Sequence, residues 1–92
     1  MPQAYTNSDV EVVRRQIGAL CKPSYVPRKG TGVQTTVEVF KMDKVVEFTT
    51  TVESGHWLTT WNAELERIVE NAWPAARMQI KKGVYYTVVV RF

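Results

Sequence analysis

The sequence predicts a single α+β domain, a two-layer sandwich of order α-β-β-α-β in which two helices cover one face of a three-stranded antiparallel sheet. Three observations support this prediction. In two segments apolar residues recur every three or four positions, as they do on one face of a helix. Three other segments are rich in Val, Thr and aromatic residues, which fit the pleated surface of a strand. A chain of 92 residues also has room for one core rather than two.

The first helix is expected to begin after Ser8 and to end before Pro23. Ser8 and Glu11 have the spacing of a capping box, in which each side chain bonds the other residue's backbone N–H. Residues 1–8 show no periodicity and are expected to form a flexible lead, so the domain would span residues 9–92. The expected apolar face consists of Val10, Val13, Ile17, Leu20 and Cys21.

A hairpin is expected to follow the first helix. Residues 22–32 contain two prolines and two glycines, which are typical of a loop. Residues 33–40 alternate apolar and polar side chains, and residues 45–52 are rich in β-branched side chains. Because residues 41–44 suit a tight turn, the two segments are predicted to pair in antiparallel fashion.

The second helix is predicted over residues 58–73, with Thr59 or Thr60 as its N-cap and Pro74 directly after it. Its apolar face is expected to include Trp61, Leu65, Ile68, Val69 and Ala72. Residues 75–82 are expected to form a linker.

Residues 84–92, with the sequence VYYTVVVRF, are predicted to form the third strand. Short connections favour its pairing with the first strand, which would leave the second and the last strands as the two edges of the sheet. An edge strand presents unpaired N–H and C=O groups to a partner strand. The last strand is therefore the main functional candidate in the sequence, and its partly exposed face is expected to carry Tyr85, Thr87, Val89 and Arg91.

The composition gives no support to catalysis or to metal binding. The only histidine, His56, lies in a Gly-containing loop, and the only cysteine, Cys21, cannot form an intramolecular disulfide. A zinc site needs three or four ligands, so neither a metal nor a cofactor is expected. Net charge is +3 with the basic residues dispersed, which leaves a small basic nucleic-acid-binding domain as the alternative function, although nucleic acid is the less favoured partner.

Several features in fixed order resemble the C-terminal domain of TolA and TonB, the energy-transducing proteins of Gram-negative envelopes. They are residues 12–23, the hairpin at 33–52, Ser54 and Gly55, Asn62 and Ala63, residues 72–74, and the closing strand at 88–92. The resemblance covers roughly residues 9–92 and is strongest to TolA. This chain departs from the family in three ways: it carries no N-terminal anchor or stalk, Cys21 is unpaired, and Met42, Asp43 and Lys44 replace the usual Asp-Gly turn.

The resemblance implies a non-catalytic periplasmic docking domain that takes part in envelope transport or in bacteriocin or phage reception. Its partners would be cell-envelope, colicin-like or phage-coat proteins, bound by β-strand addition at the edge of the last strand. Membrane attachment would need an anchor that this chain lacks, and a homodimer through the same edge is an open alternative. The partner-binding residues would be Tyr85, Tyr86, Thr87, Val88, Val89 and Arg91.

Overall fold

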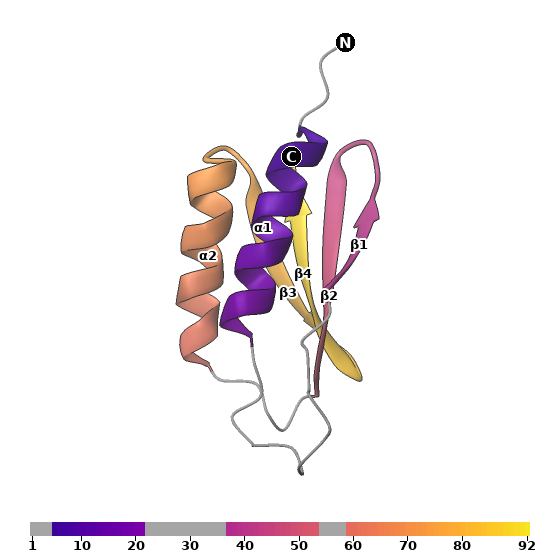
Figure 1. The fold of residues 1–92 in the computed structure, drawn as a ribbon, viewed down its shortest axis with the longest axis vertical. Helices are drawn as coiled ribbons and strands as arrows, with labels where there is room; N and C mark the ends of the chain where they lie inside the picture. The colour runs from indigo at the N-terminus through magenta and orange to yellow at the C-terminus, as the bar shows by residue number, and fades with distance from the viewer. Residues whose placement is uncertain (1–4, 22–36, 54–58) are drawn as a thin grey trace.

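The computed structural model describes residues 5–21, 37–53 and 59–92. The elements are α1 (Asn7–Leu20), β1 (Glu38–Lys41), β2 (Val45–Glu53), α2 (Thr60–Ala72), β3 (Arg77–Lys82) and β4 (Tyr85–Arg91). Both helices lie against one face of a four-stranded antiparallel sheet (Figure 1). The predicted α+β class and the placement of the helices are confirmed, but the order is α-β-β-α-β-β, with one strand more than expected.

The strand order in the sheet is β1-β2-β4-β3. The last strand is therefore central, and the prediction that it pairs with the first strand and forms an edge is wrong. Its apolar content explains this position: Val88 and Val90 are fully buried and Val89 is 2% exposed. A central strand buries both faces more completely than an edge strand, so the most continuous run of valines occupies the middle of the sheet.

Strand β3, which sequence reasoning interpreted as a linker, supplies the edge instead. Only Met78 and Ile80 are apolar in this strand, and they alternate with Arg77, Gln79 and Lys81. Met78 and Ile80 are half-buried, whereas the other three are exposed. Basic side chains are typical of edge strands, where they oppose unwanted pairing. Because so few residues of β3 are apolar, the alternation of apolar and polar residues that predicts a strand is weak in this part of the sequence.

Helix α1 begins at Asn7, earlier than predicted. Its N-cap is Thr6, whose side chain accepts a hydrogen bond of 3.1 Å from the backbone N–H of Asp9. The predicted capping box at Ser8 and Glu11 is therefore not the N-cap. The helix gains its first turn from Thr6 because a hydroxyl at that position satisfies an N–H that has no partner within the helix.

The chain is already fixed to the sheet one residue before this cap. Tyr5 is 8% exposed, and its hydroxyl donates a 2.6 Å hydrogen bond to the carbonyl of Met42. Its ring also packs against Phe92, with 5.3 Å between the ring centroids. Ordered structure thus begins before residue 9, where the sequence placed the domain boundary.

The core lies between the helices and the sheet. Each helix with its C-cap contributes three buried residues at a spacing of four, in addition to Val10 of α1 and Trp61 of α2, and Phe48 of β2 fills the space beneath them. The Phe48 ring stacks on Trp73 at 6.4 Å, and Trp73 meets Phe92 edge-on at 5.1 Å. The helical residues are Val13, Ile17 and Cys21 from α1 and its C-cap, and Leu65, Val69 and Trp73 from α2 and its C-cap.

The two halves of the chain repeat the same order of elements. Helix α1 with β1 and β2 corresponds to α2 with β3 and β4, and the two helices run in opposite directions (Figure 1). The inner strands β2 and β4 pair antiparallel at the centre of the sheet. An approximate two-fold axis therefore passes between these two strands and leaves β1 and β3 at equivalent outer positions.

Candidate functional site

The last strand cannot accept a partner strand, because both of its backbone edges are occupied. It pairs with β2 through contacts such as Phe48 opposite Val88, and with β3 through contacts such as Gln79 opposite Val89. The predicted docking edge is therefore corrected: a strand inserted here would have to displace existing ladder hydrogen bonds.

The side chains of the predicted binding residues divide between the two faces of the sheet. Val88 is fully buried beneath the helices, and Tyr86, on the same face, is half-buried. We call the sheet face away from the helices the open face. The residues of β4 on the open face are Tyr85, Thr87, Val89 and Arg91, as the alternation predicts. Only Tyr85 and Arg91 are exposed there, whereas Thr87 is half-buried and Val89 is buried.

Two hydrogen bonds show in which direction the backbone groups of each strand point. Phe92 donates its N–H to the carbonyl of Lys44 at 2.9 Å, and Met42 donates to the carbonyl of Val45 at 2.8 Å. In an antiparallel ladder the N–H and C=O of one residue point to the same neighbouring strand, and the direction alternates along the chain. Val88 and Val90 therefore bond to β2.

The alternate residues of β4 consequently bond to β3. In the observed register these residues, Thr87, Val89 and Arg91, lie opposite Lys81, Gln79 and Arg77. The N–H and C=O groups of Met78, Ile80 and Lys82 must then point away from the sheet. Within the described part of the chain, no strand pairs with this outer side of β3.

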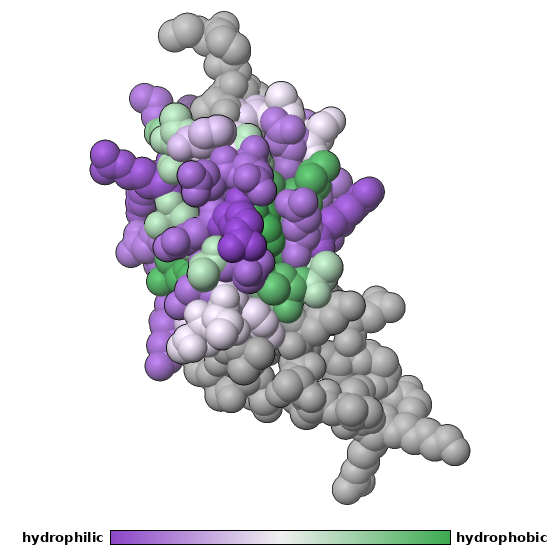
Figure 2. Space-filling view, turned by 90° about the vertical axis from the view of Figure 1, so that its left-hand side faces the viewer, coloured by the Kyte–Doolittle hydropathy of each residue, from purple (hydrophilic) through white to green (hydrophobic). Residues whose placement is uncertain are grey.

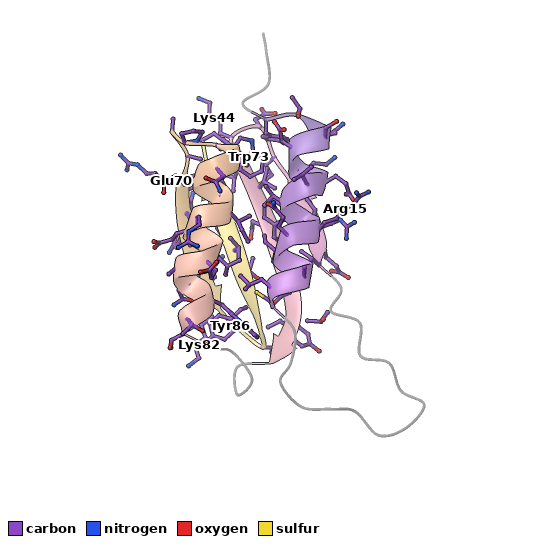
Figure 3. All side chains as sticks on the ribbon, turned by 60° about the vertical axis from the view of Figure 1, so that its left-hand side comes forward. Arg15, Lys44, Glu70, Trp73, Lys82 and Tyr86 are labelled. Atoms are coloured by element: carbon purple, nitrogen blue, oxygen red, sulfur yellow. The ribbon has the colours of Figure 1, made fainter. Side chains whose placement is uncertain are left out.

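A groove of about 220 Å³ lies beside this edge, between α2 and β3. Its lining residues are Glu66, Val69, Glu70, Pro74, Ala76 and Met78. Figure 2 views this side of the molecule and shows hydrophobic surface between bands of hydrophilic surface. In Figure 3, Glu70 and Lys82 lie toward opposite ends of the same side. The groove could accept alternate side chains of an added strand on the helix side of β3.

The open face near this edge is basic. Arg77, Lys81 and Arg91 are exposed, and no residue that the structure describes forms an ion pair with any of them. Arg77 lies directly opposite Arg91 in the ladder. Like charges in directly opposite positions destabilise a sheet, so this pair favours an acidic ligand. The acidic residues of the open face, Glu38 and Glu47, lie on β1 and β2.

The perturbed carboxylate of this structure belongs to a solvated helix surface. The Arg14 guanidinium bonds the Glu11 carboxylate, with 3.0 Å from Nε to Oε2, and thereby lowers the pKa of that carboxyl. Such i,i+3 pairs support a helix only weakly, because both groups are solvated. No group of three or more potential metal ligands occurs in residues 5–21, 37–53 and 59–92. His56 lies outside the described residues.

Cys21, the C-cap of α1, has no exposed surface, and burial raises the pKa of its thiol from 9.0 to about 12. We expect the native protein at pH 8 to resist a water-soluble maleimide, whereas the protein in urea reacts rapidly, because the thiolate is the reactive form. Mass spectrometry measures the labelling. Rapid labelling of the native protein would contradict a buried thiol. Because the folded pKa is raised, the stability that the protonated thiol contributes is complete below pH 9 and is lost as the pH rises toward 12.

No family model, curated protein or solved structure matches this chain. The resemblance to the C-terminal domain of TolA and TonB therefore stays a prediction. Among the residues described, neither helix is long and apolar enough to cross a bilayer.

Proposed function

We propose that this chain is a non-catalytic protein-docking domain that takes up an extended segment of a partner protein as a fifth strand beside β3. One observation carries the proposal: the backbone groups of Met78, Ile80 and Lys82 point outward along an edge that no described strand pairs with. In strand addition the main-chain hydrogen bonds provide affinity, and pockets for alternate side chains provide specificity. The groove between α2 and β3 supplies such a pocket.

The opposite edge is less suited to this role. Strand β1 has four residues, of which Val39 and Lys41 point their backbone groups outward, whereas β3 has six residues. Val37, directly before β1, is not part of the strand, and residues 22–36 lie outside the described structure. Among the described residues, edge β3 therefore offers the longer template.

The resemblance to TolA and TonB supports the class of partner protein that we propose, but not the choice of strand that binds it. Under this proposal the partners are cell-envelope, colicin-like or phage-coat proteins, and the domain is periplasmic. Strand addition then takes place at β3 instead of the last strand, which is central.

One observation favours a second candidate, nucleic-acid binding. Arg77, Lys81 and Arg91, which form no ion pair with any described residue, share the open face with Tyr85, which is 42% exposed. A basic surface with an aromatic ring can bind a single strand through phosphate contacts and stacking. Such binding would weaken steeply with salt and would leave the outward amides of β3 unprotected.

The docking proposal predicts a specific pattern of amide protection. In the protein alone, the amides of Met78 and Ile80 should exchange rapidly, while those of Gln79 and Lys81 are protected by β4. Addition of an extended nonapeptide, alternating Val with either Gln or Glu, should protect Met78 and Ile80 and leave their neighbours unchanged. Hydrogen exchange monitored by NMR measures each amide. If neither peptide at millimolar concentration protects these two amides, the docking proposal is wrong.

A pair of variants at one position separates the backbone contribution from that of the side chain. Met78→Pro removes an outward N–H without removing a ladder bond, so the fold should persist while peptide binding weakens about tenfold or more. Met78→Ala removes the side chain from the groove but keeps the N–H. We expect it to bind the peptide more tightly than Met78→Pro. Titration calorimetry or NMR titration would measure both, and equal binding by the two variants would contradict strand addition.

A further inference from the structure

We infer that the partner strand carries acidic side chains on the face that continues the open face of the sheet, and apolar side chains on the face that enters the groove. This inference rests on the proposed docking at β3 and names the chemistry of the segment that docks. It follows from the different charges on the two sides of the same edge.

On the open side the nearest charges are cationic. A strand added to β3 lies about 5 Å from it and about 10 Å from β4, because neighbouring strands are ~4.8 Å apart. Arg77 and Lys81 are thus in the adjacent strand, and Arg91 is in the next. Arg91 at about 10 Å and Glu47, on β2, at about 14 Å are both beyond the Debye length of ~8 Å at physiological salt, so Arg77 and Lys81 dominate. An added strand therefore meets a positive potential on this side.

On the helix side the charges that line the groove have the opposite sign, and the one cation of β3 on this side, Lys82, lies at the far end of the strand from Met78. The exposed carboxylates of Glu66 and Glu70 line the groove, together with the apolar residues Val69 and Met78. An acidic side chain pointing into this groove would be repelled, whereas an apolar side chain would lose contact with water there. The charges on the two sides together determine which side chains of the partner strand face each side. Its acidic residues must occupy alternate positions, all pointing to the open side.

The same charges disfavour a second copy of this chain as the occupant. Two β3 strands paired about a two-fold axis perpendicular to the sheet place Arg77 and Lys81 of both copies on one open face. Four neighbouring cations would then oppose the pairing. The same cations that repel a second copy would attract an acidic strand from a different protein.

The experiment compares two isosteric nonapeptides, one alternating Glu with Val and the other alternating Gln with Val. We expect the wild-type domain to bind the Glu peptide at least about tenfold more tightly than the Gln peptide, with Met78 and Ile80 protected from exchange in both complexes. The variant Arg77→Glu/Lys81→Glu should lose this preference. The control variant Lys41→Glu/Lys44→Glu has the same change in net charge at the end of β1 and in the turn to β2, away from β3, and should keep it.

The outcomes separate this inference from the docking proposal. Equal affinity for the two peptides, with both protecting Met78 and Ile80, would overturn the acidic preference and leave docking intact. A preference for the Glu peptide that persists in Arg77→Glu/Lys81→Glu would also overturn the inference, because the attraction would arise elsewhere. Absence of protection with either peptide would overturn docking itself and the inference with it. The wild-type comparison does not depend on whether the variants fold.

Discussion

Replacement of Phe48 by alanine is expected to destabilise the domain by about 3–5 kcal/mol, as large-to-small substitutions of buried aromatic residues do. Phe48 has no exposed surface, lies in an inner strand and stacks on Trp73. A chain of this length is expected to have a free energy of unfolding of only about 5–14 kcal/mol. The variant should therefore lose a large part of its stability and unfold at a clearly lower urea concentration than the wild type.

The chain contains a matched control for this substitution in the neighbouring strand. Phe40 lies opposite Glu47 on the open face and is 64% exposed. Phe40→Ala should change the free energy of unfolding by no more than about 0.5 kcal/mol. Urea denaturation followed by circular dichroism measures both variants. Similar losses in the two would mean that the assignment of the two faces of the hairpin is wrong.

The parts of the fold that the sequence predicts correctly are those with a strong apolar period. The helical spacing of Val13 and Ile17, and that of Leu65 and Val69, matches the buried face of each helix. In β4 the predicted alternation is also correct, since Val88 belongs to the helix-side core. These positions must be apolar because they are buried against a single core, so the periodicity of apolar residues in the sequence predicts them.

The edge strand and the strand order could not be obtained in the same way. An edge strand needs only one half-buried face, so β3 contains just Met78 and Ile80 among charged residues. Without this strand, residues 84–92 had no second partner and were assigned to an edge. The candidate site was misplaced for the same reason, because β4 is shielded by a strand that the period-two pattern does not reveal.

The repeated arrangement of helix and hairpin was equally hidden. The two halves share the element order, but their connections between helix and hairpin differ in length, being residues 21–37 in one and 73–76 in the other. Their buried positions share a spacing but not residue types: Cys21 and Trp73 occupy the equivalent helix ends. Packing constrains volume and face, so two halves can adopt the same arrangement with little sequence identity.

Replacement of Val89 by proline provides the most direct test of the strand order. Val89 is 2% exposed and lies opposite Gln79, to which its N–H and C=O are directed. Proline would remove that donor from the middle of the sheet and fix φ near −65°, so we expect the free energy of unfolding to fall by about 3 kcal/mol or more. If β4 were an edge strand, the same variant would keep nearly the wild-type stability.

Lys82→Pro is the matched control because Lys82 is exposed and its N–H points away from β4. Proline is tolerated at an edge where the missing donor faces solvent, so this variant should unfold at nearly the wild-type urea concentration. A Val89→Pro variant that unfolds at nearly the wild-type urea concentration would contradict the central position of β4. Unfolding of Lys82→Pro would instead contradict the direction of the β3 amides, and the docking edge depends on that direction.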